Sequence, residues 1–243
     1  MNTDPSFNWC GGRLKNQGNF AGKKFTKVQA TWKVPEFEED PPNGETHYAA
    51  IFVGLDGGSE YRSQNLLQAG VAQIVRTDAA GTTTQDCHAW YLWDLTGTLW
   101  DPTYSNYTVP GFAVSPGDTV TVTLVYKDPG QAEATFSLDG GAPISSGDFP
   151  VDAASFKGDT VEWIMERPAD RNTITPRNKL GKVNVKLTNA FGWTSDGTQV
   201  APKDGDALDM EPDGGTDANP KPPLATATLG PNFVDIKFKA HGP

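Results

Sequence analysis

Apolar and polar residues alternate with a period of two along much of the chain. Between residues 25 and 35, four apolar side chains from Val28 to Val34 share one side, while lysine, glutamine and threonine occupy the other. Residues 119–127, 182–187 and 233–239 repeat this pattern. Successive side chains of a β-strand point to opposite faces, so each segment is predicted to be a strand with one buried face.

Three further segments, residues 48–57, 65–75 and 88–95, are apolar on both faces and predict central strands. The sequence SLDGG at residues 137–141 is typical of a hairpin turn, and no strand–helix–strand rhythm is present. We therefore expect an all-β fold, a sandwich of two packed antiparallel sheets of the jelly-roll or concanavalin-like type. Residues 1–243 fit a single domain, in which the acidic, Gly/Pro-rich stretch 201–223 is predicted to be a surface excursion.

Composition narrows the possible partners. The formal net charge of -10 argues against nucleic acid or an anionic membrane, because both attract a basic surface. No apolar run approaches the roughly 18 residues of a membrane span. The two cysteines, Cys10 and Cys87, form either one disulfide or two free thiols, and their spacing leaves both alternatives open.

One acidic side chain interrupts the apolar segment VEWIMERP at residues 161–168. Strand alternation places Glu162, Ile164 and Glu166 on one face. The two glutamates lie about 13 Å apart along a strand, too far for the carboxyl pair of a retaining glycosidase. A second polar residue, Gln68, interrupts the equally apolar LLQAGV, and Gly70 on the same face is expected to leave open space beside its amide. We predict that Glu162 and Gln68 face one cleft.

Seven short blocks occur in a specific order, and together they resemble the glutamic peptidases, or eqolisins. The blocks are NWCGG, FTKVQATWKVP, FVGLDG, LLQAGV, AWYLW, VSPGD and VEWIMERP, and the resemblance covers about residues 8–191. It implies a sandwich of two antiparallel sheets and a secreted endopeptidase, active at acid pH, with a Gln/Glu dyad and neither metal nor other cofactor. Any signal or propeptide is expected to lie outside this sequence, and a monomer is the expected state.

Carried across by motif, the dyad is Gln68 and Glu162. Glu162 is expected to take a proton from the attacking water and return it to the departing amine, while Gln68 stabilises the oxyanion. The supporting or substrate-binding positions are expected to be Phe52, Asp56, His88, Trp90 and Ile164.

Two positions depart from the family pattern. His88 stands where the family has an acid, and Leu92 replaces the glutamate inside its AWYEW block. Our hypothesis is that a protonated His88 near Glu162 favours the charged base over a wider pH range. The acidic pH optimum therefore stays open.

Two other functions compete with a peptidase. One is a lectin or carbohydrate-binding module that holds sugars through Trp90 and Trp93, and the other is a jelly-roll glycosidase that pairs Glu162 with Asp94. The pairing of an amide with an acid favours a peptidase, because a glycosidase needs two carboxyl groups. An inactive eqolisin-like protein is a further alternative. His47, His88 and His241 lack the spacing of a zinc site, and the acidic residues between 204 and 213 miss the calcium-loop pattern.

Overall fold

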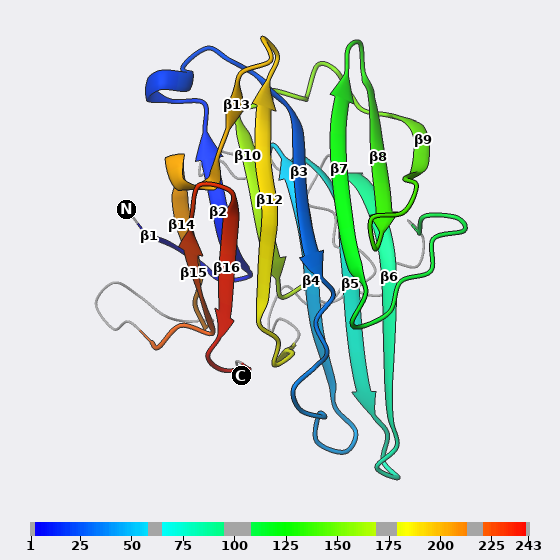
Figure 1. The fold of residues 1–243 in the computed structure, drawn as a ribbon. Coiled ribbons are helices and arrows are strands. Elements are labelled where there is room, and N and C mark those ends of the chain that lie inside the picture. Colours follow the sequence, from blue (N-terminus) through cyan, green and yellow to red (C-terminus); the bar gives the residue numbers. More distant parts are fainter. Residues whose placement is uncertain (1–2, 58–64, 95–107, 169–178, 213–220, 242–243) are drawn as a thin grey trace.

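A computed structural model describes residues 3–57, 65–94, 108–168, 179–212 and 221–241 (Figure 1). These residues contain two short 3-10 helices, η1 (Gly18–Phe20) and η3 (Pro202–Asp204), and no α-helix. None of the described helices is long or apolar enough to cross a membrane. The strands are β1 (Thr3–Ser6), β2 (Trp9–Lys15), β3 (Phe25–Lys33), β4 (Thr46–Leu55), β5 (Leu66–Thr77), β6 (Thr83–Asp94), β7 (Thr119–Lys127), β8 (Gln131–Leu138), β9 (Ile144–Pro150), β10 (Thr160–Glu166), β11 (Lys179–Leu180), β12 (Val185–Thr194), β13 (Gln199–Val200), β14 (Asp206–Met210), β15 (Ala225–Leu229) and β16 (Phe233–Phe238).

The described strands form one continuous hydrogen-bonded path in the order β6-β5-β4-β10-β2-β14-β15-β16-β12-β3-β7-β8-β9. Neighbours on this path are antiparallel, whereas the short strands β1 and β11 pair in parallel with β14 and β4. The predicted all-β antiparallel fold is confirmed. The strands follow a single hydrogen-bonded path that curls over itself, and the finer prediction of a two-sheet sandwich stays a prediction.

The two limbs of this path face each other across the main hydrophobic core (Figure 1). Strand β3 packs against β4 and β10, and β7 packs against β4 and β5. Trp163 on β10 is fully buried in this core, and its indole Nε1 donates a hydrogen bond of 3.0 Å to the backbone oxygen of Gln29 on β3. Because Trp163 points into the core, its neighbour Glu162 must point to the opposite face of the sheet.

The alternating segments form strands as predicted. In β3, Val28, Ala30 and Trp32 are buried, whereas Lys33 is exposed. Strand β7 alternates throughout, and β16 covers most of the expected range. The segment expected at 182–187 is shifted, since β12 begins at Val185 and continues to Thr194.

One predicted loop is partly wrong. Within residues 201–223, β14 (Asp206–Met210) pairs with β2, and its side chains Ala207, Leu208 and Met210 are buried. The acidic residues at positions 204, 206 and 209 led to the prediction of a loop here, although the apolar residues between them contribute to the core. Residues 213–220 lie outside the described part of the chain.

The cysteines are too distant for a disulfide. Cys10 lies on β2 and Cys87 on β6, and β10, β4 and β5 separate these strands. Four strand spacings amount to about 19 Å, whereas bridged Cα atoms are about 4.4–6.8 Å apart. Both thiols are free, which settles the alternative that the sequence left open.

Candidate functional site

Glu162 and Gln68 lie in one row across the sheet. Glu162 on β10 is the register partner of Gly54 on β4, and Gly54 is the partner of Gln68 on β5. Directly opposed residues of an antiparallel sheet project from the same face, so both polar side chains rise from one face on either side of a glycine. Two strand spacings place their Cα atoms about 10 Å apart.

Gly54 lets the Glu162 carboxylate approach the backbone between these two side chains. A methyl group at position 54 would lie 2.9 Å from Oε2 of Glu162 and 3.2 Å from Cδ1 of Leu66. The Glu162 carboxylate therefore already leans over Gly54, toward the strand that carries Gln68. A side chain at this position would displace the Glu162 carboxylate.

Both polar side chains are withdrawn from solvent. Glu162 is fully buried, and Gln68 is only 1% exposed. Within the described part of the structure, neither the Nε2 nor the Oε1 atom of Gln68 has a hydrogen-bond partner. A buried amide without partners is costly and uncommon, and such groups concentrate at functional sites. Gln68 thus has free donor and acceptor capacity in a low-dielectric setting.

An apolar row lies beside the polar one. Ile164, Phe52, Gly70 and Trp90 follow one another across β10, β4, β5 and β6. Phe52 and Trp90 are in edge contact at 5.9 Å between ring centroids, and both are fully buried together with Ile164. The structure thus places the three predicted supporting residues next to the dyad, packed beneath the surface.

The expected open space at Gly70 is filled. A methyl group there would lie 2.1 Å from the backbone oxygen of Ile51 and 2.6 Å from Cβ of Phe52. Gly70 therefore permits close packing of Phe52, and the glycine that lies between the two dyad residues is Gly54 instead. Sequence alone could not distinguish the two glycines, because only the register shows which one separates Gln68 from Glu162.

Asp56 fixes the chain that leads into β10. Its carboxylate accepts hydrogen bonds from the backbone N–H groups of Lys157, at 2.6 Å, and Asp159, at 2.7 Å. Burial raises the pKa of Asp56, and these backbone donors partly oppose the shift. Asp56 itself has a left-handed backbone, with φ of 65°. Its contacts make it a support for the strand that carries Glu162.

Glu166 has a separate structural partner. It lies four residues from Glu162 and accepts a hydrogen bond of 3.1 Å from Nδ2 of Asn8. This contact ties the segment before β2 to the end of β10. The expectation that Glu166 is no catalytic twin of Glu162 is consistent with this arrangement.

His88 does not lie near Glu162. Its register partner is Ala72, four residues along β5 from Gln68, and β6 is three strands away from β10. The two Cα atoms are therefore about 19 Å apart. The hypothesis that His88 acts on Glu162 is wrong, because this distance is too long for a direct interaction. The sequence motif showed that His88 lies on a strand, but it did not show how many strands separate it from Glu162. Leu92, in contrast, is the register partner of Gln68 and gives it an apolar neighbour.

The structure brings a cation to Glu162 that the sequence reasoning missed. Arg13 on β2 is the register partner of Glu162, on the side of β10 away from Gly54. Its side chain is only 7% exposed. The available signal was the arginine in WCGGRL, a segment otherwise composed of apolar and small residues.

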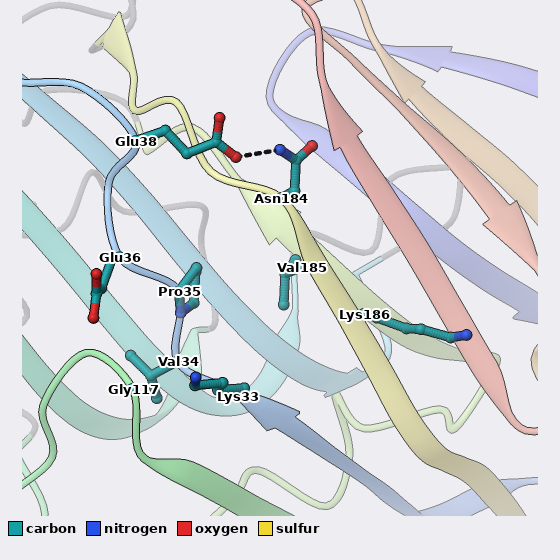
Figure 2. Close-up of a pocket in the computed structure, with 9 residues that line it drawn as sticks. All are labelled: Lys33, Val34, Pro35, Glu36, Glu38, Gly117, Asn184, Val185 and Lys186. Atoms are coloured by element: carbon teal, nitrogen blue, oxygen red, sulfur yellow. Dashed lines mark hydrogen bonds between the residues drawn. The ribbon is translucent and has the colours of Figure 1, made fainter.

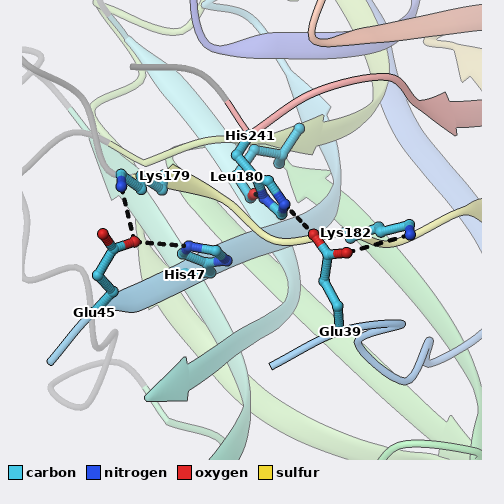
Figure 3. Close-up of polar contacts among 7 residues, drawn as sticks. All are labelled: Glu39, Glu45, His47, Lys179, Leu180, Lys182 and His241. Atoms are coloured by element: carbon cyan, nitrogen blue, oxygen red, sulfur yellow. Dashed lines mark hydrogen bonds and ion pairs between the residues drawn. The ribbon is translucent and has the colours of Figure 1, made fainter. Parts of the chain in front are cut away.

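Two histidines distant in sequence meet on another part of the surface (Figure 3). The rings of His47 and His241 are 4.6 Å apart, and each approaches a glutamate, Glu45 and Glu39 respectively. Lys179 also donates to Glu45, at 2.8 Å. The described residues contain no group of three or more ligands arranged to hold a metal ion.

A cavity of about 380 Å³ lies beside the end of β3 and the start of β12 (Figure 2). Charges of both signs line it, and Glu38 accepts a hydrogen bond from Asn184 across it. It includes none of the residues around Gln68 and Glu162. Its lining is Lys33, Val34, Pro35, Glu36, Glu38, Gly117, Asn184, Val185 and Lys186.

Comparison with known proteins identifies the family. The model of the peptidase A4 family matches residues 7–237. The chain belongs to this family, the eqolisin glutamic peptidases. The predicted resemblance and enzyme class are thereby confirmed.

Individual proteins agree with this assignment. Aspergillopepsin-2 of Aspergillus niger is 27% identical over 233 residues, which cover 88% of this chain and 73% of that protein. The structure of scytalido-glutamic peptidase with a transition state analog inhibitor superposes with a TM-score of 0.66 at 20% identity, covering 96% and 99% of the two chains. SCP-B, an eqolisin solved with the tripeptide Ala-Ile-His, gives a TM-score of 0.65 at 20% identity with the same coverage.

Proposed function

We propose that this protein is an acid-acting endopeptidase that hydrolyses peptide bonds with Gln68 and Glu162 as its catalytic dyad. The observation that carries the proposal is the row formed by Glu162, Gly54 and Gln68, in which the acid and the amide flank a residue without a side chain. Membership of the peptidase A4 family supports the same reaction class.

Glu162 is the general base in the first step. Its carboxylate takes a proton from a water molecule as that water attacks the scissile carbonyl, and the resulting acid gives the proton to the departing amine. The reaction therefore begins with Glu162 ionised. Activity is expected to fall as the pH drops below the pKa of this carboxyl group.

Gln68 stabilises the charge that develops on the carbonyl oxygen. Its amide N–H can donate to the oxyanion, and its own carbonyl oxygen can orient the water. Because both amide atoms lack protein partners in the described structure, the approaching substrate meets no competing hydrogen bond there. Burial of the two groups strengthens these interactions, and it also requires this face to open when a peptide enters.

The two competing functions fit the geometry less well. A glycosidase that pairs Glu162 with Asp94 would join residues whose Cα atoms are three strand spacings and two residues apart, about 16 Å, whereas the carboxyl groups in such enzymes are about 5–9.5 Å apart. A lectin that stacks a sugar on Trp90 requires an accessible ring, and Trp90 is fully buried. Trp93 packs toward the core beside Phe156, at 6.2 Å between ring centroids.

The test is proteolysis of a denatured protein substrate between pH 2 and 7. Glu162→Gln and Gln68→Ala are each expected to lower kcat by about 100-fold or more, since each removes a group that acts in the transition state. Glu166→Gln is the matched control, because Glu166 lies on the same strand and face but is bonded to Asn8. Full activity in both dyad variants would falsify the mechanism, and glycan binding without proteolysis in the wild type would favour the lectin.

The remaining assignments follow from the same proposal. The substrate is a polypeptide, and the supporting residues are Phe52, Asp56, Trp90 and Ile164. We infer a secreted monomer in which residues 1–243 form one domain and which needs no cofactor. The curled sheet path is also consistent with a jelly-roll sandwich, in which the dyad lies on the face of β10, β4 and β5 that points away from the main core.

A further inference from the structure

Glu162 lies between a cation and an amide. On the β4 side it faces Gly54 and then Gln68, and on the β2 side its register partner is Arg13. Directly opposed residues on one face have Cβ atoms about 4.5–5.5 Å apart, a separation that a guanidinium group spans easily. The row therefore places a permanent positive charge beside the proposed general base.

The burial of Arg13 gives this charge its effect. The arginine is 7% exposed and Glu162 is fully buried, so little water screens the interaction between them. A buried carboxylate is unfavourable unless an opposite charge or hydrogen bonds compensate it. A guanidinium group remains protonated at every pH at which an acid peptidase could operate, unlike a histidine.

We propose that Arg13 is a positioning residue that keeps the Glu162 carboxylate ionised, and therefore competent as a base, in the acidic range. This inference rests on the proposed function of Glu162. It assigns to Arg13 the role that the sequence had suggested for His88.

Two other acidic residues, Asp206 and Asp56, lie near the row that contains Arg13 and Glu162. On the far side of Arg13, its register partner on β14 is Asp206, which also lies 3.9 Å from Lys15. This register places Asp206 where it can compete with Glu162 for Arg13, and Lys15 where it can offset part of that competition. Asp56, just beyond the end of β4, is held by backbone donors.

The remaining neighbours add little charge. On β5, Gln68 does not titrate, and on β6 its register partner is Leu92. On β10 itself, Glu166 lies about 13 Å away and is bonded to Asn8. Arg13 is thus the only cation that directly opposes Glu162 among the described strand residues.

The first test is the pH dependence of kcat/KM for Arg13→Met. Removal of the charge is expected to move the acid limb of the profile upward by about 1–3 pH units, the range by which an adjacent arginine affects a carboxyl group. Arg13→Lys keeps a charge and is expected to restore most of the wild-type limb. Asp206→Asn is expected to move the limb in the opposite direction. Arg76→Met is the matched control, because Arg76 lies on β5 but pairs with Asp86 at the far end of the strand.

A purely structural role would lower activity or stability without moving the limb, and that result would overturn the proposal. If Arg13→Met does not fold, Arg13→Gln retains polar donors without the charge and is expected to give the same displacement. An unmoved limb in a folded Arg13→Gln protein would likewise count against the proposal.

A second test does not depend on activity. A double-mutant cycle that compares Arg13→Met in the wild type and in Glu162→Gln measures the coupling of the two side chains through the unfolding free energy. Arg13→Met is expected to destabilise the wild type more than the Glu162→Gln protein. If the two side chains are coupled but the dyad variants keep full activity, only the proposed function is rejected. If the dyad variants lose activity but the effects of Arg13→Met and Glu162→Gln on the unfolding free energy are additive, only the role of Arg13 is rejected.

Discussion

The carboxylate of Glu162 lies over Gly54, 2.9 Å from the point where a side chain on that residue would begin. The residue that separates the acid from Gln68 across the sheet therefore has no side chain, which lets the carboxylate lie close to the backbone of β4. Gly54 is required because it has no side chain, not because of its backbone conformation, since its φ is not positive.

Gly54→Ala is expected to reduce kcat/KM by about 100-fold while the protein stays folded, because a displacement of the Glu162 carboxylate near 1 Å suffices for such a loss. Steady-state kinetics with a fixed peptide substrate measures it. Gly141→Ala is the control, since a methyl group there also makes a close contact, 3.0 Å from the backbone oxygen of Leu138, but in the turn after β8 and away from the dyad. Equal loss of activity per folded molecule in both variants would contradict the role of Gly54.

Asp56→Asn is expected to lower the unfolding free energy by about 1–3 kcal/mol, because one of two buried acceptor oxygens becomes an NH2 group facing a backbone donor. Chemical denaturation measures this change. Asp139→Asn is a suitable comparison, since Asp139 accepts one exposed hydrogen bond from Thr119 and its replacement is expected to cost under about 0.5 kcal/mol.

The pH dependence of Asp56→Asn provides a separate check. The raised pKa of Asp56 means that the folded state keeps this proton at a pH where the unfolded chain has lost it. Wild-type stability from this residue is therefore greatest at low pH, and it falls as the pH rises from about 3.9 through the folded-state value. The variant lacks that contribution, so the difference in stability between the two proteins should depend on pH only between about 3.9 and the folded-state pKa of Asp56.

His47→Phe is expected to improve stability under mildly acidic conditions. Burial and the nearby His241 lower the pKa of His47, so the unfolded chain takes up this proton first as the pH falls below about 6.5. Stability is consequently lost through this window until the pH passes below the folded-state pKa. The phenyl ring keeps the contact with His241 but cannot be protonated. Thermal unfolding between pH 7 and 4 measures the difference.

Phe238→Leu separates packing from protonation at this cluster. Phe238 also contacts the His241 ring, at 4.9 Å between centroids, but it does not titrate. Its replacement should change stability by a similar amount at each pH. The prediction for His47 fails if His47→Phe and the wild type lose stability equally on acidification.

Reducing agent is expected to leave the melting temperature unchanged, because Cys10 and Cys87 lie on strands too far apart to be bridged. Burial raises the pKa of Cys87 to about 11 and that of Cys10 further, so both thiols should react slowly with alkylating agents in the folded protein. Mass spectrometry after alkylation in denaturant should find both cysteines modified. A protected pair in the unreduced, denatured protein would show that a disulfide exists.

Much of the fold is encoded in short-range patterns. The buried and exposed sides of β3 and β7 follow directly from alternation, because the direction of a side chain depends only on its position within the strand. The same rule placed Glu162 and Ile164 together and opposite Trp163. Strand β14 was not predicted, because its acidic residues indicated a solvated loop. Three of its five side chains are nevertheless buried.

The sequence by itself thus determined the all-β class, the family and the two polar residues that interrupt apolar strands. Only the tertiary structure decided which residues stand beside them: Gly54 between the dyad members, Arg13 next to Glu162, and His88 far away. The physical reason is that neighbours across a sheet are set by register and strand order, which join segments more than 100 residues apart and leave no local mark in the chain.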